Sequence, residues 1–193
     1  MPFYLFFDFE TTGIGDFSKQ KPIQLAWLIC DENKTIIKKE SLYISGNTEL
    51  NTDFHKNLNL EILNTIGISL ESVIRKFIYD VEFVIDSKNG YIFAHNISFD
   101  RQILINSVFD CNLQSIFNIE KFDKKSVCTM KSTVNICKIP KNSHYKFPKL
   151  SELYFHLFNE PPTQTLHEAM GDVTVLYLCV MKLLELELLD LKQ

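Results

Sequence analysis

The sequence lacks an excess of positive charge. Its 193 residues carry 20 lysines and arginines against 24 aspartates and glutamates, which gives a formal net charge of -4. This balance excludes a histone-like protein that holds nucleic acid by neutralising many phosphates. If the chain handles nucleic acid, something other than bulk positive charge must hold the phosphate.

Paired cysteines and long apolar runs are also missing. The five cysteines, an odd number, include no Cys-x-x-Cys pair, which favours reduced thiols in a cytoplasmic, intracellular protein over a zinc site or a disulfide framework. No stretch approaches the ~18 apolar residues of a membrane span, so we expect no membrane partner. The apolar residues 3–7 end at Asp8 and follow no basic leader, so they predict a strand and not a signal peptide.

The sequence otherwise has the composition of a globular protein, 46% hydrophobic and 23% charged. Its length and its lack of repeats or linkers predict a single domain over residues 1–193. Apolar runs predict strands at residues 3–9, 23–30, 35–44, 91–95 and 127–130. Helical spacing predicts helices at residues 57–65, 69–85, 98–108, 148–157 and 168–189. This order favours an α/β fold whose mixed sheet is covered by helices on both faces.

Two acids end the first predicted strand. Asp8 and Glu10 are two residues apart and therefore share one face of the strand, whereas Phe9 faces the other way and is expected in the core. Carboxylates so close repel each other, and a divalent cation between them would relieve that repulsion. The same Asp-x-Glu spacing occurs at Asp80 and Glu82, but within a helical pattern, so we expect that pair to be solvated.

A third acid follows the strand at residues 91–95. The strand is expected to end at His95, a structural residue, and the next helix to begin near Ser98 as its N-cap. Asp100 then lies in the first helical turn, where charge–dipole attraction is the alternative to a functional role. Phe99 is expected in the core.

A fourth acid opens the last helix. Asp172 lies one turn into it, and His167 comes five residues earlier, about 140° round a regular helix. We therefore place His167 on the preceding loop, able to swing toward a site that Asp172 helps to form. Each motif is weak alone, since His95 and Asp100 have the same spacing. The inference depends on acids at three strand or helix starts, in this order.

These motifs, in this order, resemble those of the DEDD 3′–5′ exonucleases. Residues 8–13 match the first family motif, residues 94–100 the second and residues 167–172 the third. The tyrosine branch would need Tyr where this chain has Glu168. The chain therefore resembles the DEDDh branch, which includes the proofreading epsilon subunit of bacterial DNA polymerase III and TREX-type deoxyribonucleases. The likeness spans residues 3 to about 184.

The resemblance implies the RNase H-like fold, with a mixed five-stranded sheet flanked by helices. It also implies hydrolysis of DNA from its 3′ end by a two-metal-ion mechanism that releases nucleoside 5′-monophosphates. Asp8, Glu10 and Asp172 would be direct ligands of two Mg²⁺ ions, for which Mn²⁺ could substitute, because all donors are carboxylates. Asp100 would complete the catalytic and metal site, directly or through a water. His167 would be the general base, a task that suits an imidazole at neutral pH.

The resemblance also implies where substrate binds. Thr11 and Thr12 follow the first motif and are expected to contact the terminal nucleotide, and Asn96 is expected to bind substrate, orient a neighbour or cap a helix. Three lysines in the loop before the third motif either contact the phosphate backbone or are simply solvated: Lys141, Lys146 and Lys149.

The expected partner is the 3′ end of nucleic acid, with single-stranded DNA preferred. The motif Thr-Thr-Gly at residues 11–13 favours DNA only modestly. An RNA 3′–5′ exonuclease of the oligoribonuclease or RNase T type stays open, and so does a non-catalytic RNase H-like proofreading or binding subunit. The last helix is apolar nearly all round, which favours deep burial but leaves open a homodimer or a polymerase or repair partner.

Assigning four acids to one site changes the meaning of the net charge. Without Asp8, Glu10, Asp100 and Asp172, 20 acids balance 20 bases. Two Mg²⁺ ions would cancel the four site charges. We therefore predict a weak, metal-dependent hold on a few terminal nucleotides, with little processivity unless a partner supplies it.

Overall fold

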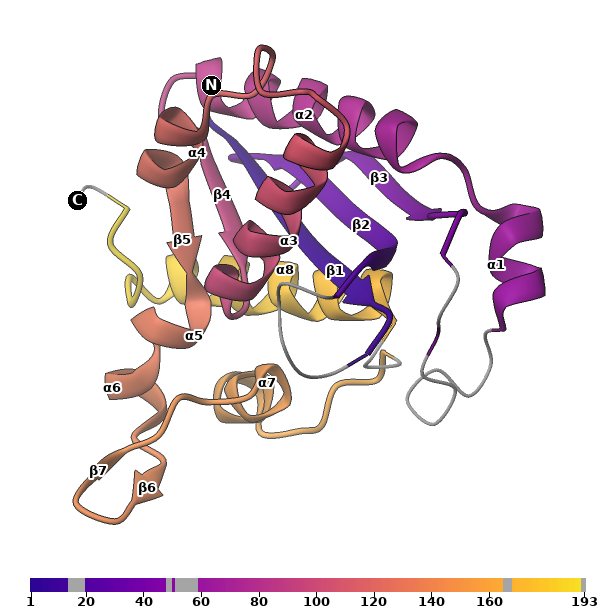
Figure 1. Ribbon diagram of the computed structural model, residues 1–193. Helices are drawn as coiled ribbons and strands as arrows, with labels where there is room; N and C mark the ends of the chain where they lie inside the picture. The colour runs from indigo at the N-terminus through magenta and orange to yellow at the C-terminus, as the bar shows by residue number, and fades with distance from the viewer. Residues whose placement is uncertain (14–19, 48–49, 51–58, 165–167, 192–193) are drawn as a thin grey trace.

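The computed structural model describes residues 1–13, 20–47, 50, 59–164 and 168–191. Its centre is a five-stranded sheet in the order β3-β2-β1-β4-β5 (Figure 1). β1 pairs antiparallel with β2, β2 pairs antiparallel with β3, and β4 runs parallel to both β1 and β5. The strands are β1 (Phe3–Thr11), β2 (Pro22–Asp31), β3 (Ile36–Tyr43), β4 (Tyr91–Ala94) and β5 (Ser126–Cys128).

Helices cover both faces of this sheet. The longer ones are α2 (Leu70–Asp86), α3 (Ile97–Asp110) and α8 (Ala169–Glu185), and the shorter ones are α1 (Leu60–Ile66), α4 (Ile119–Lys125), α5 (Thr129–Ser132), α6 (Val134–Cys137) and α7 (Leu150–Phe158). A small hairpin of β6 (Pro140–Lys141) and β7 (His144–Tyr145) projects from the body of the molecule (Figure 1). The mixed sheet flanked by helices confirms the predicted fold class.

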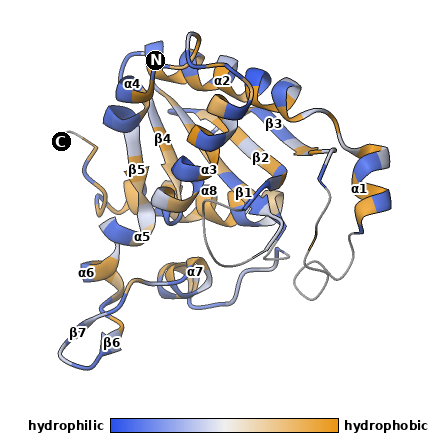
Figure 2. Cartoon of the chain, in the orientation of Figure 1, coloured by the Kyte–Doolittle hydropathy of each residue, from blue (hydrophilic) through white to orange (hydrophobic). Residues whose placement is uncertain are grey.

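Alternation along β1 divides the core into two layers. Leu5, Phe7 and Phe9 are buried with residues of α2, α3 and α4 on one face. Phe6 is buried on the other face, where it packs with residues of α8. Figure 2 shows hydrophobic residues in the central strands and alternating hydrophilic and hydrophobic residues along α2. Asp8 and Glu10 continue the face of Phe6, so both carboxylates point to the α8 side of the sheet.

Helix α8 is apolar nearly all round because it is covered on two sides. Val173, Leu176 and Val180 pack toward the sheet, whereas Val175 and Cys179 pack with residues of α7. Burial of α8 between the sheet and α7 accounts for apolar residues on nearly all its sides, in agreement with the favoured prediction of deep burial.

The start of α3 differs from the prediction. The helix begins at Ile97, and Asn96, not Ser98, occupies the N-cap position. Asn96 thus occupies the cap position that was one of its expected roles, but it has a left-handed backbone with φ of 69° and makes no side-chain capping bond. Only two residues join Ala94 to α3, and asparagine tolerates the left-handed conformation that this tight connection requires.

The prediction for Asp80 is wrong. Its side chain is buried, with only 3% of the residue exposed. Asp80 Oδ2 accepts a hydrogen bond of 2.7 Å from the indole Nε1–H of Trp27, and the Lys38 ammonium lies 2.7 Å from the carboxylate. The helical period was right, but the residue lies on the inner face of α2. Its partners Trp27 and Lys38 lie on β2 and β3, and they make the burial of the carboxylate tolerable. No local sequence pattern shows that these partners lie opposite it.

The cysteines agree with the expectation of reduced thiols. All five lie in described parts of the chain and are free, with Cys30 and Cys179 buried. Burial raises the pKa of these two thiols to about 12, so both stay protonated. Within the described ranges, no helix is long and apolar enough to span a bilayer.

Candidate active site

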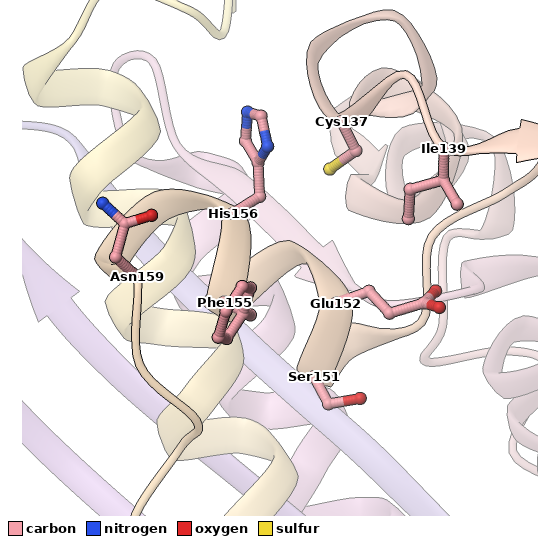
Figure 3. Close-up of a pocket in the computed structure, with 7 residues that line it drawn as sticks. All are labelled: Cys137, Ile139, Ser151, Glu152, Phe155, His156 and Asn159. Atoms are coloured by element: carbon pink, nitrogen blue, oxygen red, sulfur yellow. The ribbon is translucent and has the colours of Figure 1, made fainter.

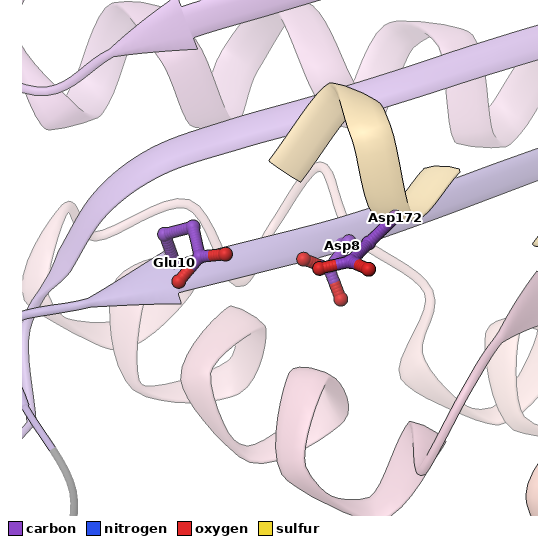
Figure 4. Close-up of side chains that lie close together, drawn as sticks. All are labelled: Asp8, Glu10 and Asp172. Atoms are coloured by element: carbon purple, nitrogen blue, oxygen red, sulfur yellow. The ribbon is translucent and has the colours of Figure 1, made fainter. Parts of the chain in front are cut away.

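Three carboxylates converge beside the C-terminal end of β1. Asp8, Glu10 and Asp172 each offer an oxygen within 4.8 Å of those of the other two. Figure 4 shows Asp8 and Glu10 on the same side of β1, with Asp172 reaching them from the first turn of α8. Glu10 is buried, and the other two are partly exposed. The structure thus brings together residues that are more than 160 positions apart in the sequence.

Asp100 also contacts β1, from the helix that follows the neighbouring strand β4. It lies in the first turn of α3 and is 1% exposed. Its Oδ1 accepts a hydrogen bond of 3.1 Å from the backbone N–H of Phe9. β4 pairs with β1 only as far as Phe6, so Asp100 satisfies a backbone donor of β1 beyond the end of β4. Asp100 is not one of the three carboxylates that share the 4.8 Å cluster.

The pKa values of Asp8, Glu10 and Asp100 reflect burial and crowding. Burial, followed by the charges of Asp100, Asp172 and Glu10, raises the pKa of Asp8 well above its usual value. Burial and the Asp172 charge raise the pKa of Glu10 to about 7. Burial raises the pKa of Asp100 to about 7, although the hydrogen bond from the Phe9 N–H lowers it. Asp8, Glu10 and Asp100 therefore resist ionisation in the metal-free protein.

This donor set fits a divalent cation. Like charges this close are unstable together unless protons or a cation neutralise them. The three clustered donors are all carboxylate oxygens, which hard cations such as Mg²⁺ prefer, and none is a sulfur or imidazole donor. Asp8, Glu10 and Asp172 are the residues that would hold such an ion.

A polar row across the sheet extends the site, and sequence reasoning missed it. Glu10 pairs with Gln24 on β2, and Gln24 pairs with Tyr43 on β3, so the three side chains share one face. Gln24 is 4% exposed, and its Nε2 donates to Ser41 Oγ at 3.0 Å and to Glu168 Oε1 at 3.4 Å. A glutamine near the start of an otherwise apolar strand was the signal that could have revealed this row.

The turn after the first motif is braced internally. The Thr11 hydroxyl lies 2.8 Å from Gln20 Oε1 and 3.1 Å from the Gly13 carbonyl. Thr12 Oγ1 accepts a hydrogen bond of 3.3 Å from the backbone N–H of Lys21. These contacts hold the chain close to Glu10. Whether Thr11, Thr12 and Asn96 contact substrate stays a prediction.

His95 has the structural role expected of it. Its Nε2 lies 3.0 Å from the Pro148 carbonyl, and its Nδ1 lies 3.0 Å from Thr129 Oγ1. A carbonyl oxygen only accepts, so Nε2 carries the proton. Burial lowers the pKa of His95 to about 4, so the ring is neutral at pH 7 and Nδ1 accepts from the Thr129 hydroxyl.

The structure describes some of the remaining predicted residues but not all of them. His167, the expected general base, lies outside the described residues. Phe9 is buried, and Phe99 is partly buried against the same core, as expected. Lys146 forms an ion pair with Glu152.

Two hollows of about 470 Å³ lie elsewhere on the surface. One lies beside α6 and α7 and is lined by Cys137, Ile139, Ser151, Glu152, Phe155, His156 and Asn159 (Figure 3). The other lies between the start of β2 and α3, where Lys21, Gln102 and Asp110 contribute to its lining. Neither hollow is lined by one of the four site acids, so they do not replace the carboxylate cluster as the candidate site.

Solved structures resemble this chain closely in fold. E. coli exonuclease I in complex with a dT13 oligonucleotide matches with a TM-score of 0.70 and 16% identity, over 96% of this chain and 41% of that one. A product-bound exonuclease I matches with a TM-score of 0.71 and 14% identity, over 97% and 45%. Exonuclease I from Methylocaldum szegediense matches with a TM-score of 0.70 and 14% identity, over 96% and 41%.

The fold is RNase H-like. The likeness to exonuclease I agrees with the fold that the three motifs led us to expect. The chain spans less than half the length of the exonuclease I chains that it matches. The sequence matches no protein-family model and no curated protein. The RNase H-like fold places the carboxyl ends of β1 and β4 beside the N-terminal turn of α8, where the carboxylates meet.

Proposed function

We propose that this protein is a metal-dependent 3′–5′ exonuclease that hydrolyses DNA and releases nucleoside 5′-monophosphates. The observation that carries the proposal is the convergence of Asp8, Glu10 and Asp172 within 4.8 Å. This cluster occurs in an RNase H-like fold that is similar to exonuclease I, including a structure with a bound dT13 oligonucleotide. Acidic residues gathered from separate elements have no evident structural purpose, because they repel each other.

The proposed cofactor is a pair of Mg²⁺ ions, for which Mn²⁺ can substitute. Asp8, Glu10 and Asp172 would hold them, and Asp100 would contribute directly or through a water. When bound, the ions would stabilise the charge of the phosphate group under attack and favour deprotonation of the attacking water. Carboxylates whose pKa values are raised by burial and crowding are poised to exchange protons for cations.

The chain's own residues have distinct proposed tasks. His167 accepts the proton of the attacking water, for which an ordinary histidine pKa near 6.5 is suitable. Asp100 orients the end of β1 through the Phe9 N–H and thereby fixes the direction of Asp8. The turn at Thr11 and Thr12 receives the terminal nucleotide, because it follows Glu10 directly.

Matched oligonucleotides test the proposal. We expect 5′-labelled single-stranded DNA to be shortened from its 3′ end with Mg²⁺ and to stay intact with a chelator. RNA and duplex DNA of the same sequence are run beside it. Faster shortening of the RNA would replace DNA by RNA as the substrate, and shortening from the 5′ end would contradict the proposed polarity.

Variants assign the activity to the cluster. Glu10→Gln removes one buried acid of the cluster, whereas Glu32→Gln makes the same change at an exposed position. We expect the first to lose at least about 100-fold in rate and the second to match the wild type. Full activity in Glu10→Gln or in Asp8→Ala would refute the proposed metal site. A wild-type protein that binds DNA without cleaving it would favour the non-catalytic subunit.

A further inference from the structure

Positive charge is concentrated in one part of the chain. Residues 124–151 contain no aspartate or glutamate. Seven of the 20 lysines and arginines lie in this stretch of 28 residues: Lys124, Lys125, Lys131, Lys138, Lys141, Lys146 and Lys149. A protein with a net charge of -4 therefore has one segment that is strongly basic.

From the carboxyl end of β5 onward, this basic segment begins and ends beside the candidate active site. It leaves the sheet through β5 and continues through α5, α6 and the β6–β7 hairpin (Figure 1). It returns at Pro148, which is buried. His95, at the end of β4, contacts both Thr129 and Pro148. The neutral imidazole of His95 therefore holds both ends of the stretch from Thr129 to Pro148 at the carboxyl edge of the sheet, next to the acids.

Four lysines of the segment are exposed and form no ion pair with any described residue: Lys131, Lys138, Lys141 and Lys149. Lys131 reaches the start of α3, where its Nζ is 3.3 Å from Ser98 Oγ. Asp100 follows Ser98 by two residues. The basic side chains thus begin at the acidic site and continue outward to the hairpin.

Exposed aromatic side chains lie in the same segment as these lysines, and Tyr145 pairs with Pro140, the neighbour of Lys141, in the hairpin. Tyr145 is 45% exposed and Phe147 is 56% exposed, on either side of Lys146. Phe155, also 56% exposed, lines the neighbouring hollow beside α7 (Figure 3). Exposed rings and the four lysines without an ion pair to a described residue therefore share one segment of the chain. They suit single-stranded nucleic acid, whose bases stack on rings and whose phosphates attract lysines.

We propose that Lys131, Lys138, Lys141, Lys149, Tyr145 and Phe147 form a strand-binding surface. It takes the single-stranded polynucleotide on the 5′ side of the terminal nucleotide that the carboxylates receive. The inference rests on the proposed function, because that function supplies the 3′ end at the acidic site. A purely acidic peptide would use the lysines but has no flat π-faces for Tyr145 and Phe147, so a nucleic acid fits the whole surface better.

Binding measurements test the surface separately from cleavage. All proteins carry Asp8→Ala to prevent hydrolysis, and the ligands are labelled trithymidylate and dodecathymidylate with Mg²⁺. The lysine variant is Lys138→Gln, Lys141→Gln and Lys149→Gln. We expect it to bind the 12-mer at least about tenfold more weakly at low salt, with a logarithmic salt slope shallower by about 2, from roughly 0.7 for each lost phosphate contact. Binding of the 3-mer should change little.

The aromatic variant, Tyr145→Ala and Phe147→Ala, tests stacking. We expect about a tenfold loss for the 12-mer with an unchanged salt slope, because stacking involves no ion release. Matched controls remove exposed residues from other parts of the molecule: Lys39→Gln with Lys88→Gln, and Tyr79→Ala, whose ring is 75% exposed. These controls should bind both oligonucleotides as the parent does.

The outcomes separate this surface from the proposed function. If the wild-type protein cleaves DNA but the lysine and aromatic variants bind the 12-mer normally, the surface is refuted and the exonuclease stands. If the wild-type protein does not cleave, the exonuclease is refuted, and weakened 12-mer binding in both variants still supports the surface. If a hexaglutamate peptide displaces the 12-mer as effectively as unlabelled DNA does, the surface is one for acidic peptides and the inference is overturned.

Discussion

Two Asp-x-Glu pairs with the same spacing have opposite surroundings in this protein. Asp8 is crowded by Asp100, Asp172 and Glu10. Asp80 is buried against two donors, the Trp27 indole and the Lys38 ammonium. Burial is therefore not the property that distinguishes a functional acid from a structural one. The sign of the neighbouring charges distinguishes them.

Replacing Asp8 should separate activity from stability. Asp8→Asn removes one charge from a cluster of acids, so we expect the metal-free protein to melt at a higher temperature than the wild type. Nuclease activity should fall at least about 100-fold, because a cation loses a ligand. Thermal melting in a chelator, beside an activity assay with Mg²⁺, measures both. A lower melting temperature would contradict the assigned repulsion.

Replacing Asp80 should have the opposite effect. Asp80→Ala leaves the Trp27 N–H without its acceptor and Lys38 without its counter-charge, so we expect a loss of about 3 kcal/mol in the free energy of unfolding. Urea denaturation measures this loss. Glu82→Ala, at the partly exposed second position of the pair, is the control and should change stability by less than about 0.5 kcal/mol. Equal effects of the two substitutions would refute the structural role of Asp80.

At the scale of elements, long periodic segments were predictable and short ones were not. β1, β2 and α2 have enough residues for their period to be visible in the sequence. α5 and α6 have four residues each, and β6 and β7 have two. One helical turn shows no period, so tertiary contacts decide these elements. The His95 contacts that pin this region are an example.

The His95 pin should make stability depend on pH. Its pKa is about 4 in the folded protein and near 6.5 in the unfolded chain. Between these values the unfolded chain binds a proton that the folded protein does not, so stability falls as the pH falls from about 6.5 to 4. The 2.5-unit difference corresponds to about 3 kcal/mol.

A non-titrating side chain isolates this contribution. His95→Gln has an amide that can donate to the Pro148 carbonyl, and it has no proton to gain in this range. Urea denaturation at pH 7 and pH 4.5 should show a smaller loss of stability for His95→Gln than for the wild type. An equal loss in the two proteins would mean that His95 does not titrate as assigned.

At the scale of the whole molecule, the two charge concentrations lie side by side. The acids occupy the carboxyl edge of the sheet, and residues 129–151, which contain no aspartate or glutamate, leave from that same edge. Although the net charge is only -4, negative and positive side chains are therefore concentrated in two separate regions of the molecule. A cation bound by the acids would remove the repulsion between these carboxylates and the phosphates at the 3′ end of a nucleic acid. The strand-binding surface also strengthens the hold that the balanced net charge led us to expect to be weak.

Divalent cations should stabilise the protein more as the pH rises. Glu10 and Asp100 have pKa values of about 7 in the folded protein, against about 4 in the unfolded chain. Between these values the unfolded chain releases protons that the folded protein keeps, so metal-free stability falls as the pH rises from 4 to 7. Ionised carboxylates then bind Mg²⁺.

Thermal melting at pH 6 and pH 8, with Mg²⁺ or with a chelator, checks this dependence. We expect the increase in melting temperature caused by Mg²⁺ to be larger at pH 8 and to be mostly lost in Asp8→Asn. Glu32→Gln should behave like the wild type. An equal increase at the two pH values would contradict the exchange of protons for cations at this site.

The sequence by itself determined the fold class, the central strands and the acids of the candidate site. Those features depend on local periods and on short motifs, both of which can be read along the chain. Only the tertiary structure decided that Asp80 is buried against Trp27, that Gln24 extends the polar row from Glu10, and that His95 pins the basic segment to the acidic edge. Each of these depends on a partner in a distant part of the chain. Local sequence encodes which side of an element is apolar, but not which donor or charge lies opposite it after folding.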